Sequence, residues 1–454
     1  MFSRRLTWPC PPNRLSRLVD EKRTRAKRLF DLTGSNPTRA GLSYPAEAIA
    51  AALADAGAAL YEPSARGLGT ARAAVAEDAA RRGRPVAPDR LVLTASTSEA
   101  YALLFKLLAD PGETVLVPRP SYPLFDYLAA LEGLRVSTYP LAFDDGFSID
   151  LDALESLLDA RDTAPPRAVV LVNPNNPTGT ALRRGERSRL REICGARGVA
   201  LISDEVFLDY LDQDEVDAAA RIGDPVVSAA SGGAGAATGP ADGALTFTLG
   251  GLSKSCGLPQ MKLGWIVADG PGALVSEALE RLELIADTYL SVGTPVMRAA
   301  GRLLEIGAAI RSAIRRRVAE NLEALRGRLN PGSACRLLRR DGGWYAVLQV
   351  PATAPEEDLV LTLLAEDDVL VHPGYFFDFP REAYLVLSLL PAPAEFDEAL
   401  RRVLARLVTR LRISRSLRWT LGASGSPAAS LPSMLAKNSV SSRAPGPAGM
   451  MPCW

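Results

Sequence analysis

Short apolar segments alternate with longer helical patterns through the middle of the chain. Segments of strand length lie at residues 91–93, 114–117, 168–172, 199–202 and 245–249. Near-continuous apolar strands with helical crossovers are typical of parallel sheets that are covered on both faces. We therefore predict an α/β fold with a mostly parallel central sheet. In such sheets, ligands bind beyond the carboxyl ends of the strands.

Helical patterns flank this region at residues 12–29, 45–60, 71–82, 273–288 and 295–329. Three further apolar strands follow, at residues 344–350, 369–372 and 384–389. Beyond residue 413, Ser, Pro, Ala and Gly dominate, which is typical of a disordered tail. The pattern predicts four parts: an N-terminal arm that joins the small domain (1–44), a large domain (45–285), a small α/β domain (286–413) and the tail (414–454).

The charge balance favours a small-molecule partner. The 454 residues include 52 Lys plus Arg and 52 Asp plus Glu, so no bulk field attracts nucleic acid or an anionic membrane. No apolar run is long enough to span a membrane, and the N-terminus has no secretory pattern. The five cysteines show no CxxC spacing, and His372 is the single histidine, so we expect no disulfide framework and no metal site. We expect a cytoplasmic protein.

Polar residues follow the predicted strands. After the first strand, Ser96, Thr97 and Ser98 open a helix, whose N-terminus is suited to binding phosphate. Ser96 and Glu99 also have the spacing of a capping box, so simple helix capping is the alternative. Prolines hold Tyr122 after the second strand, where its ring would either stack on a flat ligand or pack in the core.

Asn176 follows the third strand in a sharp loop with two Asn-Pro steps. Its amide is able to donate to a phenolic oxygen. Asp204 follows the fourth strand directly, so its carboxylate needs a cationic partner such as a protonated pyridine nitrogen.

Lys254 lies in the glycine-rich segment 250–265 after the fifth strand. A lysine that loses hydration in a crowded turn favours its neutral amine, which can form a Schiff base with a carbonyl. A solvated loop lysine is the alternative. An amine, a carboxylate for a ring nitrogen, an aromatic ring, an amide and a phosphate-binding helix together match pyridoxal phosphate.

On these residues the chain resembles the class I and II aminotransferase family of fold-type I enzymes, over residues 32–407. The specific motifs are Asn175-Asn176-Pro177-Thr178-Gly179, Ser203-Asp204-Glu205-Val206, and Ser253-Lys254 with Gly257 and Gly264. The resemblance implies that Lys254 holds the cofactor and moves the substrate proton, that Asp204 keeps the pyridine protonated, that Asn176 bonds the ring hydroxyl and that Tyr122 stacks. It implies a homodimer in which the phosphate is bound by Ser96, Thr97, Ser98, Ser253, Lys262 and the partner's Tyr61.

Three positions depart from the family pattern. Phe207 replaces a tyrosine that bonds the ring hydroxyl, and Lys262 replaces a phosphate-binding arginine. Val386 replaces the arginine that binds the substrate carboxylate. We therefore expect the substrate to contact Asn176 and the backbone amides at Gly34 and Ser35, or Arg381.

The resemblance implies an aminotransferase that moves an amino group between an amino acid, or a related amine, and a 2-oxo acid by a ping-pong route. A pyridoxal phosphate lyase or decarboxylase is the second reading, because the same electron sink serves those reactions and the carboxylate-binding arginine is missing. A non-catalytic cofactor-binding regulator is the third. The N-terminal arm is too short for a winged-helix DNA-binding domain, which disfavours this reading.

Overall fold

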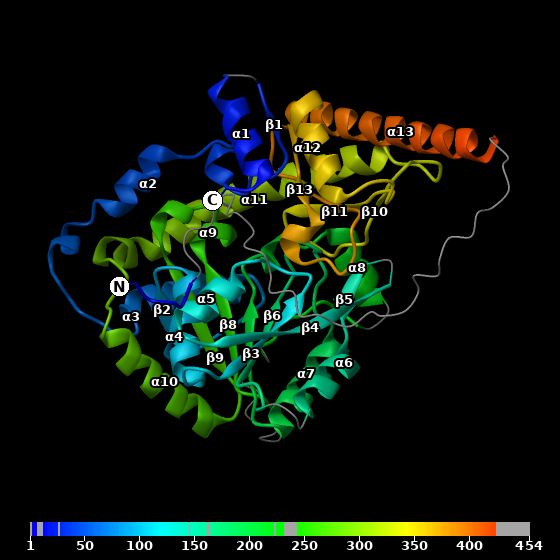
Figure 1. Cartoon of the computed structure of the whole chain (residues 1–454). Coiled ribbons are helices and arrows are strands. Elements are labelled where there is room, and N and C mark those ends of the chain that lie inside the picture. The colour runs from blue at the N-terminus through cyan, green and yellow to red at the C-terminus, as the bar shows by residue number, and fades with distance from the viewer. Residues whose placement is uncertain are drawn as a thin grey trace.

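The computed structural model describes residues 2–6, 12–25, 28–144, 146–160, 164–221, 224–230 and 243–423. The chain forms a large unit around an eight-stranded sheet and a small unit around a four-stranded sheet (Figure 1). Residues 424–454, which make up most of the expected tail, lie outside the described residues. In the described ranges, no helix combines the length and apolar character needed to cross a membrane.

The α-helices are α1 (Arg14–Thr24), α2 (Ala46–Leu53), α3 (Gly69–Arg81), α4 (Thr97–Leu108), α5 (Phe125–Leu131), α6 (Leu151–Leu158), α7 (Arg184–Ala196), α8 (Gln213–Arg221), α9 (Leu252–Ser255), α10 (Gly272–Asp287), α11 (Thr294–Gly327), α12 (Glu356–Asp367) and α13 (Pro393–Ala423). The 3-10 helices are η1 (Pro37–Arg39), η2 (Ala56–Ala59), η3 (Pro88–Arg90), η4 (Leu208–Tyr210), η5 (Pro259–Met261) and η6 (Gly374–Phe377). The strands are β1 (Phe30–Asp31), β2 (Leu91–Thr94), β3 (Thr114–Arg119), β4 (Arg135–Phe143), β5 (Phe147–Ile149), β6 (Ala168–Val172), β7 (Ala200–Asp204), β8 (Thr246–Gly251), β9 (Gly264–Asp269), β10 (Arg336–Leu337), β11 (Tyr345–Gln349), β12 (Val369–Leu370), β13 (His372–Pro373) and β14 (Tyr384–Ser388).

The large sheet has the strand order β2-β9-β8-β7-β6-β3-β4-β5. Strands β4, β3, β6, β7 and β8 run parallel. Strand β9 is antiparallel to both β8 and β2, so β2 points in the same direction as the parallel strands. The prediction of a mostly parallel sheet is confirmed. The sequence pattern alone does not separate β9 from the glycine-rich loop before it, and this strand was not predicted.

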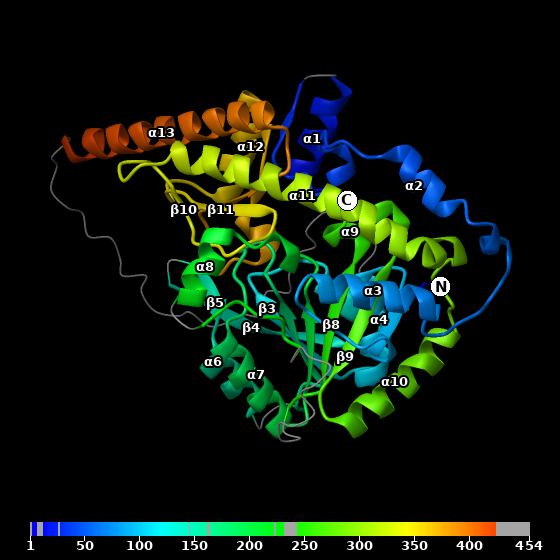
Figure 2. The ribbon, with the colours of Figure 1, turned by 180° about the vertical axis from the view of Figure 1, so that it is seen from behind.

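Helices cover both faces of the large sheet. Alternate side chains such as Val92 and Ile202 pack with α4, α5 and α10 on one face. Their neighbours, such as Leu91 and Leu201, pack with α3, α6 and α7 on the other (Figure 1, Figure 2). All five residues of β6 are buried, as expected of a central strand between two helical layers.

The small sheet has the order β10-β11-β14-β13 and is antiparallel throughout. The N-terminal part of the chain joins this unit, because β1 pairs with β12 and α1 packs against α12. Helix α13 continues to Ala423, past the expected boundary at residue 413. We propose that the two sheets mark the two domains expected from the sequence.

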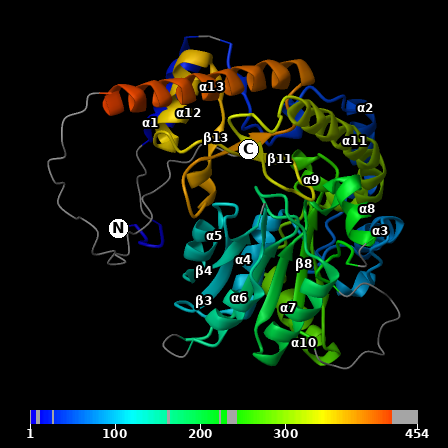
Figure 3. The ribbon, with the colours of Figure 1, turned by 90° about the vertical axis from the view of Figure 1, so that its right-hand side faces the viewer.

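The small unit sits on the carboxyl edge of the large sheet (Figure 3). The loop between β10 and β11 carries Asp341, whose N–H donates to Gly179 O at 2.9 Å and whose carboxylate forms an ion pair with Arg183. In the same loop, Gly343 N–H donates to Tyr210 O at 2.8 Å. Since Gly179 follows β6 and Tyr210 follows β7, this loop ties the small unit to the two strand ends where the site is expected.

Candidate active site

The strand ends that carry the predicted site residues are neighbours in the large sheet. Val172 of β6 pairs with Asp204 of β7, which pairs with Leu249 of β8. At the next position along this edge, Gly264 of β9 pairs with both Gly251 and Thr94. Segments far apart in the sequence therefore meet at one edge. The sheet brings the loops with Asn176, Asp204, Lys254 and Ser96 together there.

Lys254 lies in α9, directly after β8, beside two aromatic rings. Its Nζ is 5.2 Å from the centre of the Trp344 ring and 6.0 Å from the centre of the Phe207 ring. Its charge also acts on the carboxyl of Asp204. The structure thus places the predicted amine within electrostatic range of the predicted carboxylate and beside two aromatic rings.

Asp204 is the last residue of β7, and its carboxyl group is closely surrounded by protein atoms. Val206 N–H donates to its Oδ1 at 3.2 Å, and the Tyr101 hydroxyl donates to its Oδ2 at 3.4 Å. Burial nevertheless raises the pKa of Asp204 to about 6, because these donors and the charge of Lys254 offset desolvation only in part. An additional cationic partner would complete this environment.

The predicted phosphate-binding residues lie around the N-terminus of α4. Ser96 is the N-cap, and its Oγ accepts from Glu99 N–H at 3.2 Å. The Glu99 carboxylate turns back and accepts from Ala95 N–H at 2.6 Å, one residue before the position expected from a capping box. The N–H groups of Thr97 and Ser98 are in the first turn, so they have no acceptor within the helix. The Glu99 carboxylate is therefore bonded to the backbone, and the N–H groups of the first turn remain available to bind an anion.

The pairing of β8, β9 and β2 brings the segments with Ser253 and Lys262 close to the N-terminus of α4. Ser253 follows β8, and Lys262 precedes β9 by two residues. The approach is tight, because a Cβ on Gly264 would lie 3.1 Å from the carbonyl carbon of Ser96. The Lys262 side chain is exposed, with its backbone in the left-handed region at φ +51°.

The loops after β3 and β6 are hydrogen-bonded to each other. Asn175 Nδ2 donates to Pro120 O at 3.1 Å, and Ser121 Oγ donates to Asn175 Oδ1 at 3.3 Å. The next residue, Asn176, has a buried side-chain oxygen with no hydrogen-bond partner among the described residues. Tyr122 is half-buried against the core of the large unit. The side chain of Asn176 thus has an oxygen that can still accept a hydrogen bond.

Tyr61 and Gly34 differ in their surroundings. The Tyr61 side chain is 72% exposed and borders a small surface cavity together with Tyr289. Gly34 lies beside β14, where its carbonyl accepts from Ser388 Oγ at 2.6 Å. The structure therefore places Gly34 next to the strand of Val386, whereas Tyr61 faces outward.

Val386 is fully buried at the centre of β14. Its partners in the neighbouring strands are Val347 and His372, which share its face of the small sheet. Burial lowers the pKa of His372 to about 4, so this ring is neutral at pH 7. Arg381 is exposed, and its charge acts on the hydroxyl of Tyr384. Neither strand partner of Val386 therefore supplies a positive charge.

Three residues of the site were not predicted from the sequence. Tyr101 bonds Asp204, Trp344 faces the Lys254 amine, and Tyr210 donates to the Lys254 carbonyl at 2.6 Å. The Gly342-Gly343 pair before Trp344 signals a close backbone approach, and a Cβ on Gly342 would lie 2.6 Å from Tyr210 O. No sequence signal distinguishes Tyr101 and Tyr210 from core tyrosines.

These residues fit pyridoxal phosphate. The partly compensated carboxyl of Asp204 suits a protonated ring nitrogen, the unused amide oxygen of Asn176 suits a ring hydroxyl, and the first turn of α4 suits a phosphate.

Comparison with known proteins shows the family of the chain. The model of the family described as aminotransferase class I and II matches residues 28–403. The chain belongs to this family. The cofactor of the family is pyridoxal phosphate, in agreement with the sequence prediction.

Two relatives and one solved structure illustrate the range of similarity. Arginine–pyruvate transaminase AruH of Pseudomonas aeruginosa is 31% identical over 346 residues, which cover 74% of this chain and 80% of that protein. Nicotianamine aminotransferase 1 of Oryza sativa subsp. japonica is 30% identical over 233 residues, 51% of this chain and 42% of that protein. The chain thus matches less than half of the length of this plant relative. Alanine aminotransferase from Pyrococcus furiosus aligns with a TM-score of 0.75 at 23% identity, over 90% of this chain and 100% of that one, and shares the fold.

The first prediction concerns the lysine that binds the cofactor. Lys254→Ala removes the amine beside Asp204, so borohydride reduction in the presence of pyridoxal phosphate should leave no cofactor mass on the peptide that contains residues 250–262. Lys106→Ala is the matched control, because it removes an exposed lysine from the last turn of α4, outside the predicted site, and should keep the adduct. Mass spectrometry of the reduced proteins measures both. An adduct retained in Lys254→Ala would assign the linkage to another lysine.

The second prediction concerns the pH dependence of stability in the cofactor-free protein. The pKa of Asp204 is about 6 in the folded chain and about 3.9 when unfolded. Stabilisation by the protonated form is therefore fully present below about pH 4 and is lost as the pH rises through 6. Asp204→Asn stays neutral, so it should raise the free energy of unfolding at pH 8 by roughly 3 kcal/mol and have little effect at pH 4. Urea unfolding at both pH values is the measurement, and an equal effect at both would contradict the assignment.

Proposed function

We propose that the protein is a pyridoxal phosphate-dependent aminotransferase that moves an amino group from an amino acid, or a related amine, to a 2-oxo acid. The observation that carries this proposal is the meeting of Lys254 and Asp204 from adjacent strand ends, with a helix N-terminus beside them. Family membership supports it.

When bound, pyridoxal phosphate supplies an aldehyde that accepts amines and a ring that withdraws electrons from the bonds at the amine-bearing carbon. Lys254 would hold this aldehyde through Nζ and, once displaced by the amino donor, would take the proton from the donor's amine-bearing carbon. The Asp204 carboxylate would hold a proton on the ring nitrogen, as its raised pKa in the empty chain suggests. The aromatic wall of Trp344 and Phe207 would exclude water from the Lys254 amine.

The remaining expected residues would bind and orient. The first turn of α4 with Ser96, Thr97 and Ser98, together with Ser253 and Lys262, would hold the phosphate. Asn176 would bond the ring hydroxyl without help from Phe207, which has no hydroxyl of its own. Tyr122 would stack on the ring.

We propose a homodimer in which the partner's Tyr61 completes the phosphate site. Support comes from large apolar side chains that are exposed near it: Leu60, the preceding residue, is 61% exposed, and Tyr289 is 53% exposed. Tyr61 and Tyr289 border the same surface cavity, so they belong to one face of the molecule. We also propose a cytoplasmic location, which the buried free thiols of Cys194, Cys256 and Cys335 support.

A lyase or decarboxylase of the same family is a second candidate. Val386 is buried between Val347 and neutral His372, so the strand β14 offers no clamp for an α-carboxylate. An enzyme that holds this carboxylate loosely is less suited to common amino acids. Identification of the products separates the candidates, because only transamination yields a 2-oxo acid from each donor and an amine on the acceptor.

The third prediction tests this function with a panel of amino donors. We expect slow turnover of alanine, glutamate and aspartate with high KM values, and a preferred amine whose carboxylate is masked or distant. Val386→Arg should raise kcat/KM for a common amino acid by about tenfold, since a charge-assisted hydrogen bond contributes roughly 1.5–3 kcal/mol. Val386→Met is the matched control for bulk without charge and should give no gain. Tight, fast use of common amino acids by the unaltered enzyme, unaffected by Arg381→Ala, would contradict this prediction.

The fourth prediction concerns assembly. Sedimentation at assay concentration should show a dimer, and Tyr61→Phe should weaken pyridoxal phosphate binding while leaving the dimer intact, because it removes only the hydroxyl donor. Tyr289→Phe removes a hydroxyl from the same face and should leave cofactor affinity unchanged. A fully active monomer would refute the shared site.

A further inference from the structure

The turn that carries Lys254 is too short to maintain its own shape. Helix α9 spans Leu252–Ser255, a single turn, and such a short helix is unstable by itself because nucleation is unfavourable. Its last carbonyls also have no donors within the helix. The direction of the Lys254 side chain therefore depends on groups outside the turn.

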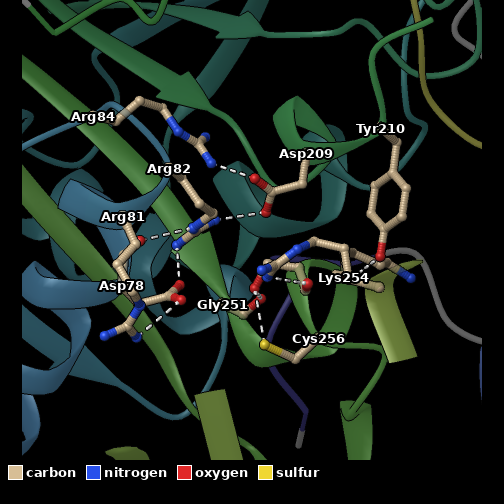
Figure 4. Close-up of polar contacts among 11 residues, drawn as sticks. Asp78, Arg81, Arg82, Arg84, Asp209, Tyr210, Gly251, Lys254 and Cys256 are labelled. Carbon is tan, nitrogen blue, oxygen red and sulfur yellow. Dashed lines mark hydrogen bonds and ion pairs between the residues drawn. The ribbon is translucent and has the colours of Figure 1, made fainter. Parts of the chain in front are cut away.

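Two side chains from other elements donate to these carbonyls. The Tyr210 hydroxyl donates to Lys254 O at 2.6 Å, and Arg311 of α11 donates to Ser255 O at 3.1 Å. Within the turn, Ser255 Oγ donates to Gly251 O at 2.8 Å. The bond from Tyr210 is the shortest of the three and acts on the lysine itself (Figure 4).

Backbone hydrogen bonds and a ring contact hold Tyr210 in place. Its N–H donates to Phe207 O and its carbonyl accepts from Gly343 N–H, each at 2.8 Å. Its ring meets the Trp344 ring edge-on at 5.1 Å. Burial raises the pKa of the Tyr210 hydroxyl well above its usual range, so the group remains a donor at all working pH values. Tyr210 thus connects the lysine backbone with the Trp344 ring and with the backbone of Phe207.

The residue before Tyr210 anchors it in the large unit. The buried Asp209 carboxylate forms ion pairs with Arg82, at 2.7 Å, and with Arg84, and Arg82 also pairs with Asp78 of α3 (Figure 4). Burial by itself would raise the pKa of Asp209, but the charges of Arg84, Arg82 and Arg311 lower it overall. The carboxylate is therefore charged at neutral pH, and its ion pairs fix η4 against α3.

We propose that Tyr210 is a positioning residue that orients the Lys254 side chain through the backbone of α9, and that Asp209 anchors Tyr210. The inference rests on the proposed function in one respect, the identity of Lys254 as the residue that binds the cofactor. Without the hydroxyl, the Lys254 carbonyl loses its short bond from Tyr210 and keeps the longer bond from Gly257 N–H, at 3.2 Å, so α9 gains freedom. The lysine amine would then reach the aldehyde and the substrate proton less often, while cofactor and donor would still bind.

The test uses Tyr210→Phe, which keeps the ring packed on Trp344 and removes the hydroxyl alone. Tyr139→Phe is the matched control. Tyr139 is a fully buried tyrosine of β4 whose hydroxyl donates to a backbone carbonyl in β6, Val170 O, at 2.8 Å, and not to α9. Both variants lose one buried hydroxyl bond, so a general loss of stability affects them alike.

Three measurements distinguish the variants. In Tyr210→Phe, the rate at which added pyridoxal phosphate becomes trapped on Lys254 by borohydride should fall about tenfold, because a small misplacement of a reacting group costs this much or more. Amide hydrogen exchange of residues 250–257 should quicken in the cofactor-free chain. With an amino donor, kcat should fall about tenfold at nearly constant KM. Tyr139→Phe should match the unaltered protein in all three.

Asp209→Asn tests the anchor while leaving the hydroxyl in place, and should quicken exchange of residues 250–257 to a smaller extent. Equal trapping and exchange in Tyr210→Phe and Tyr139→Phe would overturn the positioning role, and unchanged exchange in Asp209→Asn would overturn the anchor. Trapping and exchange need no amino donor. If no donor is converted by the unaltered protein, the proposed function fails while these two measurements still decide the inference.

Discussion

The burial of the Asp204 carboxyl at the end of β7 is the constraint on which the rest of the site depends. Two hydrogen bonds, from Val206 N–H and Tyr101, and the nearby charge of Lys254 leave its desolvation only partly offset. A carboxylate in this state attracts a cation strongly, because a buried charge is costly unless it is paired. The environment that destabilises the empty chain is therefore the one that would bind a protonated ring and keep it protonated.

The docking of the small unit completes the site from the opposite side. Asp341 is almost fully buried and joins Arg183, Gly179 and Ala181 of the large unit. A buried ion pair of this kind contributes little net stability, but its directional bonds define one arrangement of the two units. Three residues further along the chain, this arrangement places Trp344 against Phe207 and over the Lys254 amine.

The fold and the substrate specificity are separate questions in this chain. The architecture is that of the family. On the substrate side, a buried valine and a neutral histidine occupy the face of β14 where a clamp for a carboxylate is expected. Family membership therefore supports the reaction type, whereas the preferred amine depends on these side chains.

The periodicity of the sequence determined where the central strands lie and which polar residues follow them. The apolar segments at residues 168–172 and 245–249 correspond to β6 and β8, because a strand buried on both faces needs an uninterrupted apolar run. Polar residues directly after such runs, such as Asp204, can be assigned to the ligand-binding edge for the same reason. The cofactor was predictable because its functional groups require this set of side chains.

Tertiary structure alone decided which side chains orient these groups. Tyr101, Tyr210 and Trp344 read as core aromatics in the sequence, since they match the apolar pattern of their elements. Their polar atoms matter only because α4 packs on β7, η4 packs beside α9 and the small unit docks on both loops. Such contacts join residues far apart in the chain, and local pattern carries no information about distant partners. The functional groups of the predicted site could therefore be identified from the sequence, whereas packing between distant elements determined how they are oriented.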